Sequence, residues 1–202
     1  MRELDKVLET NEKVFWEGKP KFWPFFLGGF RSLIIGIFFL IIGGMVLSQG
    51  IKEGNYIFIL LPHFWIGVAL IIIPPIYTAL AYKHTYYAIT NKRLLLQKGV
   101  IGRDFEMVDF DQITNAEVRV GLIDKLFGNG SGSILISTAG SFTYTRHGAV
   151  QRPYTLQHIE NPYEVFKFFK KVSHAVKTDI HYPNKYRPKT NPGYNTDYNP
   201  KK

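Results

Sequence analysis

The chain of 202 residues has no cysteine, which excludes disulfide bonds, thiolate nucleophiles and cysteine-ligated metal sites. It also has no Lys, Arg, Asp or Glu over two long stretches, residues 32–51 and 55–82. About 20 apolar residues in a helix cross the hydrocarbon core of a bilayer. Only Lys52, Glu53 and Gly54 separate the stretches, so we expect a two-helix transmembrane hairpin with antiparallel spans at about 32–51 and 56–82.

Acidic residues are fewer than basic ones, 16 against 25, which gives a net charge of +9. The basic residues cluster before the first span and after the second, whereas the loop between the spans carries Lys52 alone. Positive residues near span ends stay on the cytoplasmic side. We therefore expect a multi-pass protein of the cell membrane with both termini cytoplasmic. A cleaved signal peptide is disfavoured, because a long segment with several acidic residues precedes the first span.

Motifs for catalysis or metal binding are also missing. The glycine-rich residues 128–132 lack a following Gly-Lys-Ser/Thr and lead into a strand, so they predict a turn rather than a phosphate loop. The histidines beyond the spans lack metal-ligand spacing. Asp109 and Asp111 have no accompanying base or nucleophile. The sequence therefore predicts a non-enzymatic protein with no catalytic residue, no cofactor and no metal.

Within the hairpin, glycines and aromatic residues predict how the helices pack. The glycines should let the helices approach closely, and they are Gly36, Gly43 and Gly44. Aromatic residues are expected in a belt at the cytoplasmic interface, and they are Trp16, Trp23, Tyr77 and Tyr82. Pro74 and Pro75 are expected to kink or interrupt the second helix, because neither ring nitrogen donates a hydrogen bond.

After the second span, short β-branched and aromatic segments alternate with turns. This pattern predicts seven strands, at residues 84–90, 93–98, 104–110, 113–120, 133–138, 141–146 and 150–156. Residues 122–127 are expected to form one helical turn or a loop. From Pro162, apolar residues at helical spacing predict an amphipathic helix, which we expect to cap a small β-barrel rather than lie on a membrane.

These patterns divide the chain into four expected parts. They are a cytoplasmic N-terminal segment at 1–31, the hairpin at 32–82, a folded domain at 83–176 and a disordered basic tail at 177–202. The tail is rich in Pro, Asn, Tyr and Lys. A purely solubilising tail and a tail that contacts the bilayer or a protein are both open.

Several short segments stand in a characteristic order. They are Trp-Glu-Gly-Lys-Pro at 16–20, Tyr-Tyr-Ala-Ile-Thr-Asn-Lys-Arg-Leu at 86–94, Gly-Val-Ile at 99–101, Phe-Gly-Asn-Gly at 127–130 and Ile-Glu-Asn-Pro at 159–162. Over roughly residues 12–176 the chain resembles the membrane-anchored bacterial pleckstrin-homology (PH) domain proteins of the YdbS-like group. The resemblance implies a mainly-β PH-like domain of seven strands with a C-terminal capping helix, on a two-helix transmembrane hairpin. It implies no established catalytic activity.

Two sets of residues are candidate sites. Phosphoinositide-binding PH domains use a long basic loop that is here only Asn91 and Lys92, so specific phosphoinositide recognition is not expected. Non-specific contact with anionic lipid headgroups is expected at four basic residues, unless they form only a solvated rim: Lys92, Arg93, Lys98 and Arg103. His63 is a candidate intramembrane polar site, or else a neutral imidazole bonded to the neighbouring helix.

The main functional hypothesis is an integral membrane protein whose cytoplasmic PH-like domain binds protein partners or anionic lipid headgroups, as a homo- or hetero-oligomeric scaffold. The alternative is a small transport or export component in which the hairpin multimerises around a path containing His63. The lipid bilayer is thus an expected partner, and so is a protein or a second copy of the chain. Nucleic acid is not expected, because a bilayer already accounts for the basic charge.

Overall fold

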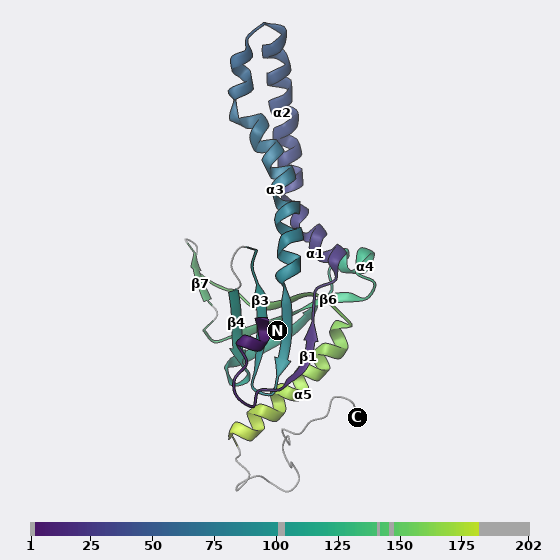
Figure 1. The fold of residues 1–202 in the computed structure, drawn as a ribbon, viewed down its shortest axis with the longest axis vertical. Coiled ribbons are helices and arrows are strands. Elements are labelled where there is room, and N and C mark those ends of the chain that lie inside the picture. The colour runs from purple at the N-terminus through teal and green to yellow at the C-terminus, as the bar shows by residue number, and fades with distance from the viewer. Residues whose placement is uncertain (1–2, 101–103, 141, 146–147, 182–202) are drawn as a thin grey trace. The chain divides into compact units, whose positions relative to one another are not determined.

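The structure is a computed structural model that describes residues 3–100, 104–140, 142–145 and 148–181. It divides into two compact units. One unit combines the N-terminal residues up to Lys21 with the chain from His84 onward, and the other is Phe22–Lys83. The first unit is a β-domain and the second is helical (Figure 1).

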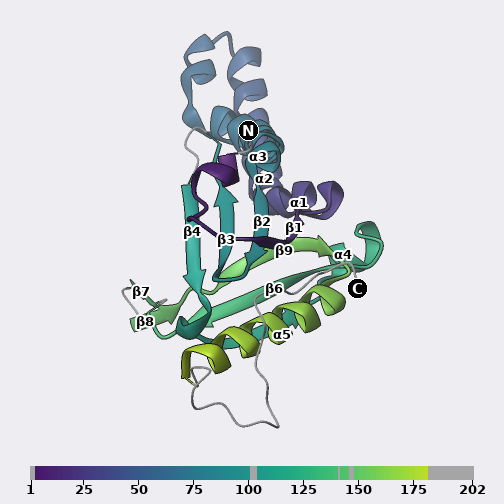
Figure 2. The same cartoon turned by 60° about the horizontal axis from the view of Figure 1, so that its bottom comes forward.

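Two antiparallel sheets form the frame of the β-domain. The first has the order β1 (Val14–Gly18), β2 (Tyr86–Thr90), β3 (Arg93–Lys98) and β4 (Asp104–Asp109). The second has the order β5 (Ile113–Arg119), β6 (Ser131–Thr138) and β9 (Tyr154–Glu160). A separate hairpin joins β7 (Phe142–Thr145) and β8 (Gly148–Gln151). Helix α5 (Pro162–His181) lies along β6 (Figure 2).

The described residues thus contain nine strands where the sequence predicted seven. The expected strand at 150–156 is wrong, because the chain leaves strand geometry at Arg152 and Pro153 and forms β8 and β9 instead. Proline has no backbone N–H to give to a strand ladder. Strand β1 was not predicted at all, although Val14, Phe15 and Trp16 are residues that favour strands.

Strand β1 changes the organisation of the whole chain. It precedes the helical unit and β2 follows that unit, yet the two strands pair directly, with Val14 opposite Thr90 and Gly18 opposite Tyr87. The helical unit is therefore an insertion between two neighbouring strands of one sheet. The structure assigns the N-terminal residues to the β-domain, where the sequence suggested a separate segment at 1–31.

The core of the β-domain lies between the two sheets and α5. The sheets supply buried side chains that include Tyr87, Leu94, Ile134 and Leu156. Helix α5 supplies residues at the predicted helical spacing, namely Val165, Phe169 and Val172. Phe110 belongs to the 3₁₀ turn η4 (Phe110–Gln112), and its ring centroid lies 6.0 Å from that of Phe169. Helix α5 continues to His181, past residue 177 where a disordered tail was expected, and the rest of that expected tail lies outside the described residues.

The helical unit contains α1 (Phe22–Gly28), η2 (Gly29–Ser32), α2 (Leu33–Lys52), η3 (Tyr56–Leu60) and α3 (Pro62–His84). Helices α2 and α3 run side by side in opposite directions (Figure 1). Glycines bring their backbones together: a Cβ on Gly43 would lie 2.6 Å from the Phe64 nitrogen, and one on Gly67 would lie 2.6 Å from the Leu40 nitrogen. Gly44 does not take part in this contact, because a Cβ there would meet nothing within 4 Å.

Helix α3 continues through Pro74 and Pro75 instead of ending there. A proline at position 74 cannot donate the usual hydrogen bond to the Leu70 carbonyl, four residues earlier. The Ser32 hydroxyl donates to that carbonyl at 3.3 Å instead. A neighbouring side chain thus satisfies the freed acceptor, which is how prolines are accommodated inside apolar helices.

Two helical segments, Leu33–Lys52 and Tyr56–His84, are long and apolar enough to cross a membrane by length and composition. Their most apolar 18-residue windows have mean hydropathies of 2.2 and 2.4, and only 17% and 6% of those residues are buried. The core helix of a soluble protein is mostly buried, and these helices are not. Most of their apolar surface is therefore without a protein cover in the described structure.

The neighbouring glycines of α2 allow a matched test of helix packing. Gly43→Ala should destabilise the helical unit by roughly 1–3 kcal/mol relative to Gly44→Ala, because the added methyl group meets the α3 backbone. Any gain in helix propensity is the same for both substitutions and cancels in the comparison. Thermal unfolding of both full-length variants in mild detergent measures the difference. Equal midpoints would contradict the described contact.

The insertion topology predicts how the β-domain can be isolated. Joining Lys21 to His84 through a flexible linker of about six residues keeps β1 beside β2 and should give a folded domain. A chain that begins at His84 lacks β1, leaves the β2 edge unpaired and should fold poorly or aggregate. NMR spectra of the two proteins test this prediction: the amide signals of the linked domain should be well dispersed, and those of the chain that begins at His84 should not. Equally dispersed spectra would show that β1 is dispensable.

Candidate functional site

A surface groove of about 530 Å³ lies between β1 and the start of α5. One wall comes from β1 and the residue after it, the other from the end of β9 and the first two turns of α5. The lining residues are Trp16, Glu17, Gly18, Lys19, Glu160, Asn161, Glu164, Val165 and Phe168. All of them belong to the β-domain.

The β1 wall is fixed by Trp16. Its side chain packs against the core cluster of the domain, and the expected place of Trp16 in an interfacial aromatic belt stays a prediction. The indole lies over Gly18, where a Cβ would come within 2.5 Å of the ring. Within the described sheet β1 has a strand neighbour on one side only, which leaves it an edge strand.

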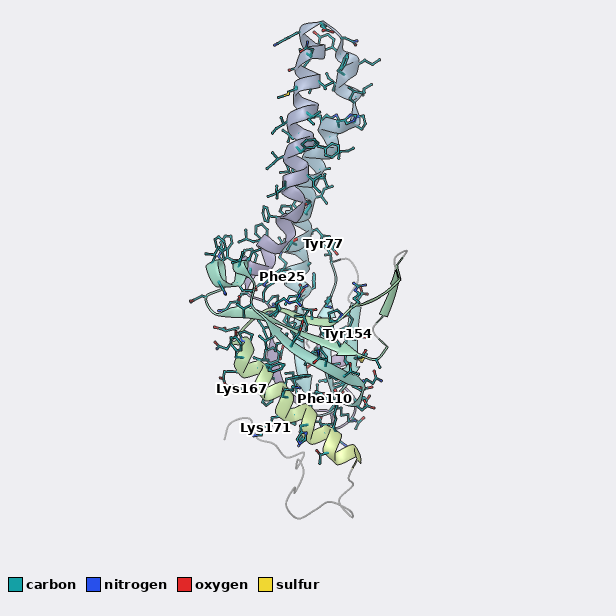
Figure 3. The ribbon with its side chains drawn as sticks, turned by 180° about the vertical axis from the view of Figure 1, so that it is seen from behind. Phe25, Tyr77, Phe110, Tyr154, Lys167 and Lys171 are labelled. Carbon is teal, nitrogen blue, oxygen red and sulfur yellow. The ribbon has the colours of Figure 1, made fainter. Side chains whose placement is uncertain are left out.

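The opposite wall is fixed by Asn161. This residue has a positive φ of 48°, a conformation that asparagine tolerates better than most residues. Its carbonyl accepts hydrogen bonds from the backbone N–H groups of Glu164 and Val165, at 3.0 and 3.1 Å. The first turn of α5 therefore starts abruptly at the end of β9 and directs Glu164 to the groove. Lys167 and Lys171 lie on the outer face of α5 (Figure 3).

The lining carries three carboxylates against one ammonium group. Lys21 pairs with Glu160 at 3.0 Å, and the two side chains are 35% and 65% exposed. Lys19 places its ammonium 4.0 Å from the centroid of the Tyr86 ring, a cation–π contact. Glu164 pairs with Lys167 at 3.1 Å, and both side chains are 74% exposed. The lining itself is therefore acidic, although Lys21 and Lys167 outside it pair with two of its carboxylates, and it offers aromatic and apolar contacts as well.

Three of the residues predicted to contact lipid headgroups have carboxylate partners in the domain. Lys92 pairs with Glu9 at 2.8 Å, and Lys98 pairs with Glu106 at 2.7 Å. Arg93 pairs with Glu12 at 2.9 Å and also contacts Glu9 at 3.2 Å. The fourth predicted residue, Arg103, lies outside the described residues.

Glu12 is the centre of this charge network. Its side chain is fully buried, and its carboxylate accepts hydrogen bonds from Arg93 and from the Thr90 hydroxyl at 2.8 Å. Burial acts to raise the pKa of Glu12, but the hydrogen bonds from Arg93, the Glu9 backbone and Thr90 outweigh it and lower the pKa. The hydrogen bond to Glu12 raises the pKa of Arg93 in turn. The turn between β2 and β3 is thus neutralised by acidic residues from the N-terminal segment.

His63 is the second residue of α3, and its side chain is exposed. Its ring stacks on Phe39 of α2, with centroids 6.4 Å apart and an interplanar angle of 20°. This stacking is the local contact that the structure gives for the candidate intramembrane site. The transport hypothesis built on His63 stays a prediction.

A second polar cluster, which the sequence did not indicate, surrounds helix α4 (Leu122–Phe127). Asp124 is 3% exposed and accepts hydrogen bonds from the Ser131 hydroxyl at 2.8 Å and from the Gly121 backbone at 3.1 Å. The Nδ1 atom of His158 lies 2.7 Å from the same carboxylate. His158 itself has a positive φ of 51°, and its backbone N–H donates to Ser133.

These residues do not form a nucleophilic triad. An activated serine must be bonded to the histidine and open to substrate. Ser131 instead donates to Asp124 and is 1% exposed. Nor do the described residues contain a group of three or more His, Cys, Asp or Glu side chains that could hold a metal ion. The cluster holds α4 in place, and no reaction step follows from its geometry.

Comparison with known proteins agrees with this architecture. The model of the bacterial PH domain family matches residues 25–162, which is more than half of the chain. The protein therefore belongs to the bacterial PH domain family, and PH domains are typically non-catalytic binding modules. No curated protein and no solved structure matches the chain.

The Asp124 cluster gives a pH-dependent test. Burial acts to raise the pKa of Asp124, but the hydrogen bonds from His158, Ser131 and Gly121 lower it below the usual 3.8. A carboxyl group whose pKa is lower in the folded protein than in the unfolded chain stabilises the fold at pH values above its unfolded pKa. This stabilisation is lost as the pH falls through the folded pKa. Asp124→Asn should therefore reduce stability at pH 7 by roughly 1–3 kcal/mol, with a smaller deficit near pH 3.

Thermal unfolding of the full chain in detergent at both pH values measures this deficit. Asp111→Asn is the control, because Asp111 is an exposed aspartate on the same domain. An equal deficit for Asp124→Asn at both pH values would contradict the role given to its charge.

Proposed function

We propose that the protein is an integral membrane protein whose cytoplasmic PH-like domain binds a basic segment of a membrane-protein partner. The observation that carries this proposal is the acidic groove beside the edge strand β1. The partner's segment would lie in the groove and pair with its carboxylates. The protein would act without catalysis, as an adaptor or scaffold.

Membrane insertion is supported by the two helical segments that are long and apolar enough to cross a bilayer. It is also supported by an aromatic cluster at the end of the helical unit where the chain enters and leaves. In this cluster the ring centroid of Tyr82 lies 5.0 Å from that of Phe22 and 6.0 Å from that of Phe25. Aromatic residues gather where a spanning helix meets the headgroups. The order of elements also fits the resemblance to the membrane-anchored YdbS-like group.

The topology supports a cytoplasmic β-domain. Basic residues flank the outer ends of both spans and the connecting loop carries Lys52 alone, so the positive-inside rule favours cytoplasmic termini. Strand β1 ends at Gly18 and α1 begins at Phe22, while Thr85 alone separates α3 from β2. An extended residue spans at most about 3.6 Å, so these links hold the paired ends of β1 and β2 near the membrane surface.

The position of the groove suggests the class of its ligand. Lys19, at its edge, is three residues before α1, so the groove would open close to the headgroups. Membrane proteins carry their Lys and Arg residues in cytoplasmic segments next to their spans. Such a segment has the charge that an acidic groove attracts. Anionic headgroups have the opposite charge requirement, and they would have to draw Arg93 away from the fully buried Glu12. A basic segment would instead displace Lys21 and Lys167 from the exposed carboxylates of Glu160 and Glu164.

The edge strand offers a second source of affinity. An extended peptide can add to an exposed sheet edge through main-chain hydrogen bonds, while side-chain pockets provide specificity. A peptide beside β1 would place alternate side chains toward Glu17 and toward the first turns of α5. We propose this arrangement for the bound segment, with Trp16 and Phe168 as its apolar contacts.

Site-specific photocrosslinking in intact membranes tests the proposal. A photoreactive residue that replaces Glu164 should give discrete adducts with a membrane protein, whereas one that replaces Asn115 on β5 should not. Glu160→Lys combined with the Glu164 probe should reduce the adducts several-fold, because it reverses a lining charge. The unsubstituted chain and the Glu160→Lys variant should fractionate with membranes to the same extent.

Adducts with lipid only, or equal adducts from positions 164 and 115, would overturn the assignment of the groove. Release of the full chain from membranes by an alkaline carbonate wash would overturn the membrane insertion itself.

A further inference from the structure

Helix α4 displays three large apolar side chains to solvent. Leu122 is 78% exposed, Leu126 is 74% exposed and Phe127 is 56% exposed, and the exposed Lys125 lies among them. Single exposed apolar residues are common on protein surfaces, but adjacent large ones mark contact sites. These three residues are close together in a single short helix.

The buried side of α4 shows that this exposure is built into the fold. Leu122 and Leu126 are four residues apart and therefore share one face of the helix. Asp124 projects into the domain, where Ser131, Gly121 and His158 hold its carboxylate. The backbone of the turn after the helix packs closely against α4, because a Cβ on Gly128 would lie 2.5 Å from the Asp124 carbonyl oxygen. The apolar face is thus held outward by hydrogen bonds on the opposite side.

Contacts within the β-domain place α4 beside the point where the chain enters the helical unit. The backbone N–H of Lys21 donates to the His158 carbonyl at 2.7 Å, and the His158 ring contacts Asp124 of α4. The Lys21 ammonium pairs with Glu160, two residues further along β9. Lys21 is the residue directly before Phe22, the first residue of α1.

From this placement we infer that α4 is a membrane-inserting wedge: Leu122, Leu126 and Phe127 enter the interfacial region of the inner leaflet, and Lys125 meets the headgroup phosphates. This inference rests on the proposed membrane insertion of the helical unit. If Lys21 lies at the membrane surface, its neighbour α4 lies there too. A lipid interface accepts apolar side chains flanked by a cation. A protein partner is the competing occupant, and lipid quenching at position 126 distinguishes the two.

The 202 residues contain no cysteine, so single-cysteine variants can be made for a lipid-quenching experiment. Leu126→Cys carries an environment-sensitive fluorophore on α4. Asn115→Cys is the control on β5, an exposed position near the end of the strand away from α4. Met45→Cys, on an exposed position of α2, reports whether the helical unit is in the bilayer. Each full-length variant is reconstituted into liposomes with or without bromine on the upper acyl chains.

The probe at position 126 should lose about half of its fluorescence in brominated liposomes, because interfacial apolar side chains bury about 5–10 Å into the headgroup and acyl boundary. The probe at 45 should also be quenched, and the probe at 115 should not. Unchanged thermal unfolding of each labelled variant would show that the substitutions leave the fold intact.

The other outcomes overturn the inference in distinguishable ways. Quenching at 45 without quenching at 126 would leave the membrane insertion standing and remove the wedge. A blue-shifted but unquenched probe at 126 would show a protein contact in place of lipid. Equal quenching at 126 and 115 would show general contact of the domain with lipid. No quenching at 45 would overturn the proposed membrane insertion, and the wedge with it.

Discussion

The pairing of β1 with β2 is the constraint on which the rest of the structure depends. These strands are separated in the chain by the whole helical unit, yet Glu17 lies opposite Ala88 and Gly18 opposite Tyr87 in one ladder. The segments that lead into and out of the helical unit therefore leave the sheet side by side. The groove exists because β1 forms one of its walls. The link from α4 through His158 to Lys21 exists because the chain after β1 lies against β9.

The charges of the β-domain show why a net charge is a poor guide to its partners. The chain carries a formal charge of +9, and this excess suggested basic contacts with anionic lipids. The folded N-terminal segment, however, places Glu9 and Glu12 over the turn between β2 and β3 and pairs them with its cations. A buried ion pair contributes little net stability against an apolar replacement, but removing one partner is costly. The pairs therefore tie the N-terminal segment to the β2–β3 turn, whereas the lining of the groove carries more carboxylates than ammonium groups.

Regular patterns in the sequence predicted much of the fold. The spacing of Val165, Phe169 and Val172 predicted α5, and segment 122–127, expected to be one helical turn or a loop, forms the short helix α4. The alternation of short apolar segments and glycine turns predicted most of the strands of the two sheets. These elements were predictable because each depends on residues close together in the chain. A strand as short as β1, with a register shift between Val14 and Trp16 and an end at Gly18, has too weak a local pattern to be recognised.

The candidate sites were less predictable, because their partners are distant in sequence. Nothing near Lys92 or Arg93 indicates that Glu9 and Glu12, about 80 residues earlier, will neutralise them. The His158–Asp124 contact joins residues 34 positions apart and has no motif. The acidic groove likewise combines residues near position 17 with residues near 164. Local periodicity carries no information about such pairs.

The proposed elements together restrict how the β-domain can lie against a membrane. A single flexible tether would let a domain rotate freely, whereas two short links from adjacent strands would restrict its rotation. A wedge at α4 would restrict the domain further, since lifting it from the bilayer would expose Leu122, Leu126 and Phe127 to water. The groove would then face the zone in which partner proteins carry their basic flanking residues. Confinement of the protein and its proposed partner to one bilayer would raise their effective concentration. A groove with few charges and modest intrinsic affinity would therefore suffice for recognition.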